Sequence, residues 1–176
     1  MRVMRTLVLA AALSWGGLAQ AQEREFTPGP VIADYGAVAE VPGAEPLPED
    51  ARFSVAFDIA EAAEDGAVSR RLESAVRFIN MHARAGVAAE NVRVAIVVHG
   101  GAHRDLLARS ADGGDNPNAG LIAALIAQGA EIYLCGQTAA YYGVDAEDLL
   151  PGVRMSLSAM TAHALLQQRG YTLNPF

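Results

Sequence analysis

Hydrophobic residues recur with two different periods after residue 51. The segment Arg52–Asp58 places an apolar side chain at every second position, which is the period of a strand. Gly66–Ala85 spaces its apolar residues three and four positions apart and is followed by Gly86, which predicts a helix that ends there. The β-branched run Val92–Val98 is typical of a strand that is buried on both faces.

The alternation of strand and helix continues to the C-terminus. Glycines close the helical segments, and apolar runs of strand length stand between them. The helices expected in this half are Asn118–Gln128, Gln137–Tyr142 and Ala159–Arg169, and the strands are Ala130–Leu134, Val153–Leu157 and Tyr171–Leu173. Such an alternation predicts a single α/β domain with a mainly parallel sheet of about five strands and helices on both faces, layered as in flavodoxin.

Two segments precede this domain, which we place at 52–176. Residues 1–21 have the pattern of a signal peptide: Arg2 and Arg5, an apolar stretch Thr6–Leu18, and a small-x-small site at 19–21. The apolar stretch has about 13 residues, against the ~20 that span a bilayer. We expect cleavage before Gln22 and a periplasmic or secreted protein without membrane contact.

Residues 22–51 form a proline-rich N-terminal arm. Proline removes backbone donors and disfavours helix, so an extended arm is expected. Five of the eight prolines of the chain lie here: Pro28, Pro30, Pro42, Pro46 and Pro48. The sequence leaves open whether the arm packs on its own subunit.

Charge and composition exclude several classes of function. Acidic residues outnumber basic ones by 20 to 13, the net charge is -7, and every basic residue is Arg. We therefore expect neither nucleic acid nor an anionic membrane as a partner, because both select clustered positive charge. A single Cys excludes an internal disulfide and a multi-cysteine zinc site. GxSxG, HExxH, Walker A and GxGxxG motifs are absent, and we expect neither a cofactor nor a resident metal.

Three of the predicted strands end at or next to residues whose side chains can take part in catalysis or binding. In an open parallel sheet, ligands bind beyond the carboxyl ends of the strands. The first predicted strand ends at Asp58, the second is followed by His99, and the third is followed by Cys135. The strand order, and with it the proximity of these three side chains, is not readable from sequence.

Of these three candidates, Cys135 has the most specific sequence signal for a reactive residue. It leaves a strand and enters a predicted helix through Gly136 and Gln137. Free N–H groups at a helix start stabilise a thiolate, which is the reactive form of cysteine. Gly136 allows a ligand or another backbone to approach closely. The alternative is a structural cysteine buried in an apolar run.

Gly100 and Gly101 follow His99 and suit either a sharp turn or a cradle for an anion. His99 is a candidate base toward Cys135. A soft-metal site made by His99, His103 and Cys135 is a weaker alternative, and a simple glycine turn is another. Of the remaining histidines, we predict His82 at the edge of the core and His163 at the surface or an interface. Tyr141 and Tyr142 are expected to pack against other aromatic groups.

The residues around Cys135 resemble the DsrE/DsrF-like family, in particular its exported branch. The resemblance extends over roughly residues 30–176. It is carried by the runs Ile132–Val144, Asp148–Val153, Ser158-Ala159 and Leu166–Tyr171, with Phe57-Asp58 and His99-Gly100 at the first two strand ends. It implies an α/β fold around a parallel sheet, assembled as a trimer or hexamer. In sulfur-relay members the matching cysteine carries a persulfide between proteins, and here that residue is Cys135.

The function expected from residues and resemblance together is an exported persulfide carrier, sulfurtransferase-like at most. Cys135 and His99 would react, and Asp58, Gly100, Gly101, Gly136 and Gln137 would position the sulfur species. Partners would be a sulfur-donor or acceptor protein, or a small sulfur species. The alternatives are a non-catalytic oligomeric ligand-binding module with a structural cysteine and, less favoured, the soft-metal protein.

Overall fold

The computed structural model describes residues 24–174, so the predicted signal peptide lies outside the described residues. Five parallel strands form one sheet in the order β4-β3-β2-β1-β5. The strands are β1 (Phe53–Ile59), β2 (Val92–Val98), β3 (Glu131–Cys135), β4 (Arg154–Ser156) and β5 (Thr172–Asn174). The helices are α1 (Arg70–Arg84), α2 (Ala119–Ala127), α3 (Gly136–Tyr142) and α4 (Ala159–Gln168), with 3₁₀ segments η1 (Ala89–Asn91), η2 (Gly100–Leu106) and η3 (Ala146–Asp148).

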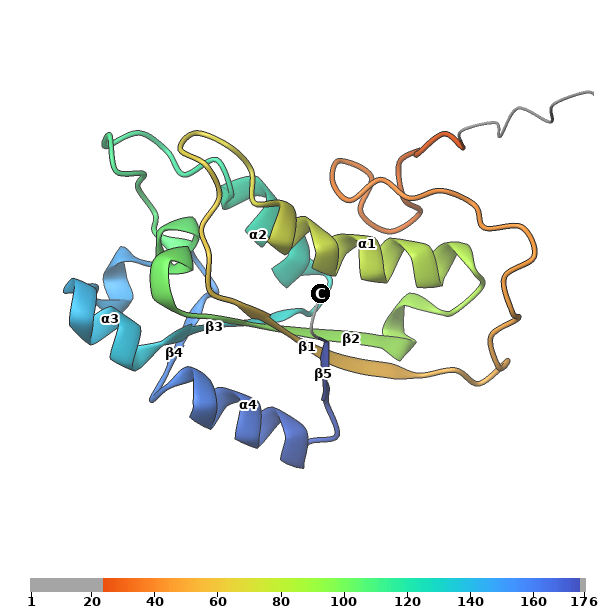
Figure 1. Cartoon of the computed structure of the whole chain (residues 1–176). Coiled ribbons are helices and arrows are strands. Elements are labelled where there is room, and N and C mark those ends of the chain that lie inside the picture. Colours follow the sequence, from red (N-terminus) through yellow and green to blue (C-terminus); the bar gives the residue numbers. More distant parts are fainter. Residues whose placement is uncertain (1–23, 175–176) are drawn as a thin grey trace, which may run out of the picture.

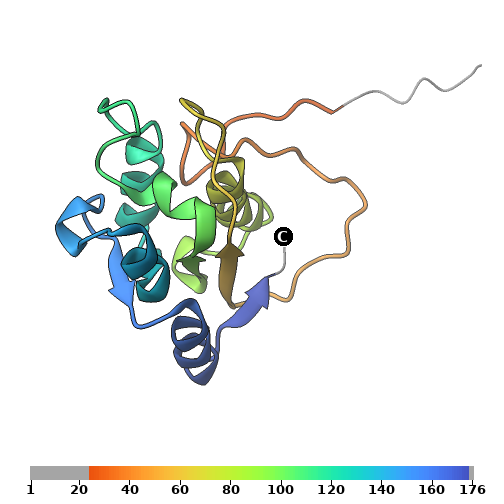
Figure 2. The same ribbon diagram turned by 60° about the vertical axis from the view of Figure 1, so that its left-hand side comes forward.

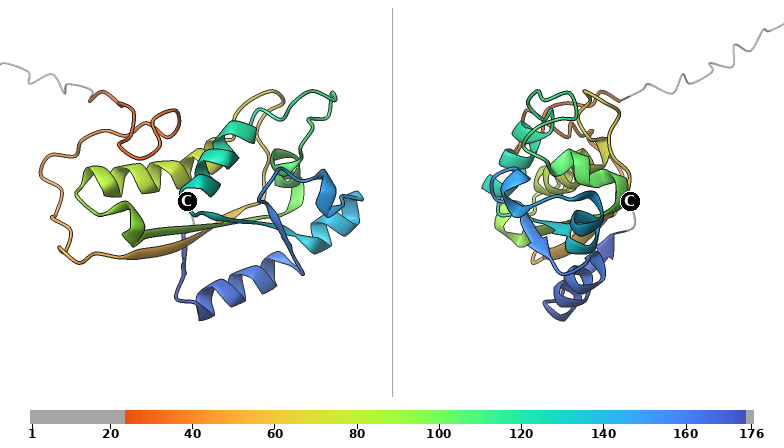
Figure 3. Two further views of the ribbon diagram at one scale, coloured as in Figure 1. Left: turned by 180° about the vertical axis from the view of Figure 1, so that it is seen from behind. Right: turned by 90° about the vertical axis from the view of Figure 1, so that its left-hand side faces the viewer.

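The path of the chain explains why the two faces of the sheet differ. From β1 to β4 the chain advances one strand at a time, and α1 and α2 cover one face (Figure 1). From β4 it crosses the whole sheet to β5, and α4 lies on the opposite face (Figure 1). Right-handed crossovers require this arrangement, because reversing the direction of advance moves the connecting helix to the other face. The view from behind shows the same layers, with α4 alone beneath the sheet (Figure 3).

The side chains follow this asymmetry. On the α1 and α2 face, large apolar residues such as Phe57, Ile96 and Leu134 form the main core. On the α4 face, the buried sheet residues beneath the helix are small: Ala56, Ala95 and Val97. The buried cluster of this face consists of Ala56, Ala95, Val97, Ala162, Leu166 and Tyr171.

The arm packs against α1 and is anchored on one buried amide, Asn80. The Asn80 Oδ1 atom accepts hydrogen bonds from the backbone N–H of Val31 (3.3 Å) and Ile32 (3.0 Å). Its Nδ2 donates to the carbonyl oxygens of Ile32, Tyr35 and Gly36 at 2.9, 3.2 and 3.1 Å. The arm therefore lies on its own domain, as the loop beside α1 in Figure 2 shows.

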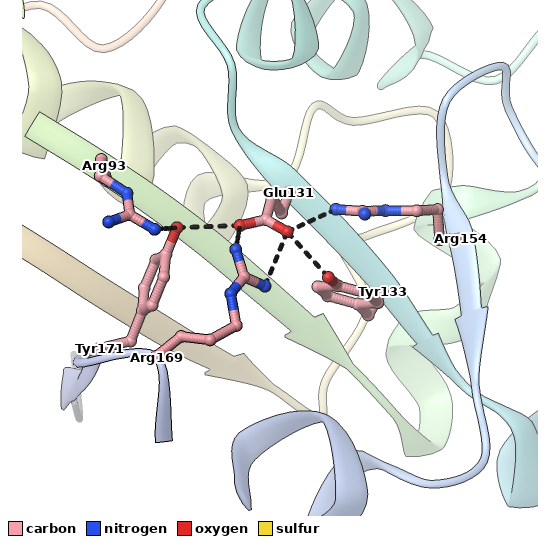
Figure 4. A network of polar contacts seen from close by, with 6 residues as sticks. All are labelled: Arg93, Glu131, Tyr133, Arg154, Arg169 and Tyr171. Atoms are coloured by element: carbon pink, nitrogen blue, oxygen red, sulfur yellow. Dashed lines mark hydrogen bonds and ion pairs between the residues drawn. The ribbon is translucent and has the colours of Figure 1, made fainter. Parts of the chain in front are cut away.

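A polar network closes the α4 face at the opposite end from Cys135 (Figure 4). At its centre the Glu131 carboxylate accepts hydrogen bonds from the guanidinium groups of Arg154 (2.8 Å) and Arg169 (2.5 and 3.0 Å). The hydroxyls of Tyr133 and Tyr171 each donate to it at 2.9 Å. The network ties the end of α4 to β3 and β4.

The predicted fold class is confirmed, with the ends of the elements shifted by up to four residues. The largest shift is in α1, which begins at Arg70 because Ser69 caps it, its Oγ accepting from the N–H of Leu72 at 3.5 Å. Within residues 24–174, no helix has the length and apolar character needed to cross a membrane.

Candidate functional site

Three predicted site residues project from the same face and the same edge of the sheet. Val98 of β2 pairs with Leu134 of β3, and both side chains belong to the main core. The next residues, His99 and Cys135, therefore lie side by side on the α4 face, because side chains alternate along a strand. Asp58 of β1 is on this face as well, since its neighbour Ile59 points into the main core.

Cys135 lies where two helices begin. It is the N-cap residue of α3, and the backbone N–H groups of Gln137 and Thr138 and the Thr138 hydroxyl are placed as hydrogen-bond donors to its ionised sulfur. The backbone N–H of Ala159, the first residue of α4, reaches the same sulfur from across the sheet edge. Burial by itself raises the pKa of the Cys135 thiol, but these hydrogen bonds outweigh it and lower the pKa below its usual value. The residue is a free cysteine with 6% of its surface exposed.

Gly136 makes the convergence of the two helices possible. A Cβ atom at this position would lie 2.5 Å from the carbonyl oxygen of Ser156 and 3.1 Å from that of Leu157. No other residue fits there without moving the segment that leads into α4. The Gln137 Nε2 atom donates to the Leu157 carbonyl at 3.4 Å, so both predicted positioning residues after Cys135 contact this segment.

Asp58 is shared by two imidazoles beside the thiol. Its Oδ2 accepts from His99 Nε2 at 3.1 Å, and its Oδ1 accepts from His163 Nε2 at 2.7 Å. Partial burial raises the pKa of Asp58, but the hydrogen bonds from His163 and His99 outweigh it and the pKa lies below its ordinary value. Since Nε2 donates in both rings, Nδ1 is the nitrogen left to exchange a proton in each neutral imidazole.

The glycine turn after β2 is engaged by α3. The Gly100 N–H donates to the Thr138 hydroxyl at 3.0 Å, so it supports the wall of the Cys135 site and does not point into an open cradle. Gly100 has a φ of +56°, and Gly101 follows it in η2. The His103 Nδ1–H donates to the Gly100 carbonyl at 2.9 Å, and the ring stacks on Tyr142 at a centroid distance of 4.1 Å.

These contacts place His103 apart from the thiol site. Across residues 24–174, no group of three His, Cys, Asp or Glu side chains is arranged to hold a metal ion. The expected aromatic packing of the tyrosines is confirmed, since Tyr141 meets Tyr142 edge to face. His82 packs on Phe53 and Phe78, as expected for the edge of the core.

His163 is the main site residue that sequence reasoning missed. It was expected at the surface or an interface, but its side chain is only 16% exposed and is hydrogen-bonded to Asp58. Ala159 was also missed as a partner of the sulfur, whereas the helix start that includes Thr138 was expected to stabilise the anion. A usable signal existed for His163, which shares the inward stripe of α4 with Ala162 and Leu166, but its partner lies 105 residues away in the chain.

Fold and site together define an α/β protein with a helix-capped thiol at the carboxyl edge of a parallel sheet. The chain belongs to the DsrE/DsrF-like family, which it matches over residues 51–175. This confirms the resemblance seen in the sequence.

Two solved structures are similar to the chain. The chain is similar to MTH1491, a protein of unknown function from Methanobacterium thermoautotrophicum, with 25% identity and a TM-score of 0.51 over 70% of this chain and 99% of that chain. It is also similar to the ychN protein of E. coli, with 17% identity and a TM-score of 0.46 over 70% of this chain and 100% of that one. No curated protein matches the chain.

Proposed function

We propose that this protein carries sulfane sulfur as a persulfide on Cys135. The observation that carries the proposal is the position of Cys135 at the N-cap of α3, where N–H groups at the starts of α3 and α4 and the Thr138 hydroxyl favour its ionised form. Such donors favour a thiolate, and they equally favour a persulfide anion held in its place. Membership of the DsrE/DsrF-like family supports the same role, because sulfur relay is a known activity within this family.

The chemistry is one thiol exchange in each direction. The Cys135 thiolate attacks the outer sulfur of a donor persulfide R–S–SH, a new S–S bond forms, and the donor's own S–S bond breaks. The products are Cys135–S–SH and the donor thiolate RS⁻, which takes up a proton. Transfer to an acceptor thiolate repeats the step with Cys135 as the leaving group. The Nε2–H of His99 is hydrogen-bonded to Asp58. The His99 ring accepts the proton that the thiol or persulfide loses on ionisation.

We propose that the partner is a protein that docks around the beginning of α4. Leu157 and Met160 flank the cap residue of this helix and are 72% and 80% exposed. The Leu157 carbonyl is bonded to Gln137, so this exposed apolar pair is directly linked to the Cys135 loop. Exposed apolar side chains beside a nearly buried reactive group favour a protein surface as the donor or acceptor.

Intact-mass spectrometry tests the carrier role. Reduced protein is incubated with polysulfide or thiosulfate, with a Cys135→Ser variant in parallel. We expect a gain of one or more sulfur atoms, about 32 Da each, that a reductant reverses and the Ser variant lacks. A natively folded, reduced protein that gains no mass would contradict the proposal, and a ligand-binding module with a structural cysteine would then stand in its place.

We also propose export and self-assembly, following the signal-like segment and the family. Expression of the whole chain followed by N-terminal sequencing of the periplasmic fraction should give a first residue of Gln22. An uncleaved cytoplasmic protein would contradict export. Sedimentation velocity should give a trimer or hexamer, and a monomer at all concentrations would contradict assembly.

A further inference from the structure

Asp58 joins three elements that are distant in the sequence. It lies at the end of β1, His99 follows β2, and His163 lies on α4. Its two carboxylate oxygens are divided between the two rings, Oδ2 bonding His99 and Oδ1 bonding His163. The His163 bond is the shorter one, 2.7 Å against 3.1 Å, and His163 is the less exposed ring, 16% against 34%. The carboxylate therefore couples α4 to the imidazole next to Cys135.

The same helix supplies part of the stabilisation of the thiolate. Ala159 begins α4, and its backbone N–H helps to lower the pKa of the Cys135 thiol. His163 comes four residues later, which is one helical turn and about 6 Å of rise along the axis. Hydrophobic packing of α4 against the sheet is limited, since only Ala162 and Leu166 of the helix are buried. The bond from His163 to Asp58 thus fixes the end of the helix that contacts the sulfur.

We propose that His163 is a positioning residue for Cys135. Through Asp58 it holds the first turn of α4 against the thiolate, and it keeps Asp58 oriented to receive the Nε2–H of His99. His99 Nδ1 is then the nitrogen that takes the thiol proton. This inference deepens the proposed function and rests on it only for the identity of the reactive group.

Other charged groups on this face must be considered, because the test follows ionisation. At the Cys135 end of this face, the titratable groups besides the thiol are Asp58, His99 and His163. Tyr133 precedes Cys135 on the same face of β3, and its hydroxyl donates to Glu131 at the far end. Arg154 and Arg169 are bonded to Glu131 there. The α3 and β4 neighbours Gln137, Thr138 and Ser156 carry no charge.

The test is the pH profile of Cys135 alkylation by iodoacetamide in His163→Leu and His163→Gln. Leu removes the N–H that donates to Asp58, whereas the Gln amide can place an N–H donor at the position of His163 Nε2. We expect Leu to move the profile to higher pH and to slow alkylation at pH 7 about three- to tenfold, since each unit of thiol pKa is a tenfold change in thiolate. We expect Gln to restore most of the rate. Gln167→Leu, exposed on the same helix, is the matched control and should leave the profile unchanged.

A second comparison asks whether His163 acts through Asp58. In an Asp58→Asn background, the His163→Leu substitution should shift the profile by much less than in the wild type, because coupled residues are not additive. A full shift in that background would overturn the proposal. A wild-type profile in His163→Leu, with the fold verified by circular dichroism, would also overturn it.

A measurement on the unmodified protein covers the case in which His163→Leu does not fold. Long-range ¹H–¹⁵N spectra report which ring nitrogen carries the proton, and both His99 and His163 should be Nε2–H tautomers when neutral. An Nδ1–H tautomer in either ring would contradict the arrangement. These results are independent of sulfur loading: a protein that takes up no sulfur but shows the His163-dependent profile loses the proposed function and keeps this inference.

Discussion

Thr138 shows how much of the site depends on a single side chain. Its hydroxyl and its backbone N–H both help to lower the pKa of the Cys135 thiol. The same hydroxyl oxygen accepts the N–H of Gly100 at 3.0 Å and so ties the turn after β2 to α3. One oxygen atom thus links the glycine turn to the thiol.

Replacing Thr138 with Val removes the hydroxyl and keeps the shape of the side chain. The pKa of Cys135 should rise, because one donor to the thiolate is lost, and iodoacetamide should react severalfold more slowly at pH 7. Stability should fall by about 1–2 kcal/mol, because the Gly100 N–H loses its acceptor. The alkylation profile and urea unfolding measure the two effects. Thr172→Val, exposed on β5, is the control, and an equal loss of alkylation rate there would contradict the assignment.

At this scale the sequence predicts the reactive residue but not its full surroundings. Cys135 could be singled out because glycine and a helix start follow it directly, a purely local signal. The N–H of Ala159 and the imidazole of His163 come from a helix that begins 24 residues later, and nothing local connects them to Cys135. His163 meets Asp58 only because α4 crosses back over the sheet.

At the scale of elements, the arm depends on α1. All five polar contacts of the Asn80 amide go to backbone atoms of the arm, and the residue is fully buried. Because the described part of the arm, residues 24–51, has no helix and only one isolated bridge, Thr27 with Val38, these bonds replace the pairing that regular structure would give it.

We expect Asn80→Ala to release the arm without unfolding the sheet. The cost should be about 2–4 kcal/mol, since several buried backbone groups lose their partner together. Hydrogen exchange followed by mass spectrometry should show faster exchange at Val31 and Ile32, with the β2 amides still protected. Asn91→Ala is the control. The Asn91 side chain accepts a hydrogen bond from the exposed side chain of Arg52 and not from the backbone of the arm. Unchanged exchange in Asn80→Ala would show that the remaining contacts, among them the bonds of Arg84 and Glu73 to the arm backbone, hold the arm without Asn80.

The elements themselves were largely predictable, because their signals are periodic and local. Val92–Val98 coincides with β2, and the glycine after each predicted helix lies just beyond its observed end. The beginning of α1 was predicted four residues early, since Ser69 and not the apolar pattern sets it. The arm was expected to be extended, but its packing against Asn80 required the tertiary structure.

For the whole molecule, the order of the strands decides where the site forms, and this order was not predictable. A strand–helix alternation is compatible with several orders. Here the return from β4 to β5 brings α4 over Asp58, His99 and Cys135. The Glu131 network fixes the far end of that return, since Arg169 and Tyr171 follow α4 while Glu131 and Tyr133 belong to β3.

The network makes stability depend on pH. The Arg169 guanidinium, with Arg154 and the two tyrosines, holds the pKa of Glu131 far below its usual value of 4.5. A depressed folded-state pKa stabilises the protein above the unfolded pKa, and this contribution is lost as the pH falls below it. Glu131→Gln should therefore cost about 1–2 kcal/mol at pH 7.

Urea unfolding across pH measures that difference. The gap between wild type and Glu131→Gln should be constant from pH 7 to about pH 5 and should narrow below pH 4.5, as the unfolded carboxylate becomes protonated. Glu90→Gln, in the exposed 3₁₀ segment η1, is the matched control and should give no such gap. A gap of equal size at pH 7 and pH 3 would contradict the ionised network.

The late position of α4 has a consequence for the newly made chain. During synthesis, Cys135 emerges before Ala159 and His163, so the nascent chain presents a cysteine whose pocket is still incomplete. Over that interval the thiol lacks one of its backbone donors and the cover of the helix, and it behaves more nearly as an ordinary exposed cysteine. The Cys135 site is therefore complete only once the chain has been made through α4. A chain that ends before residue 159 has the cysteine but lacks the Ala159 N–H and the helix that covers it.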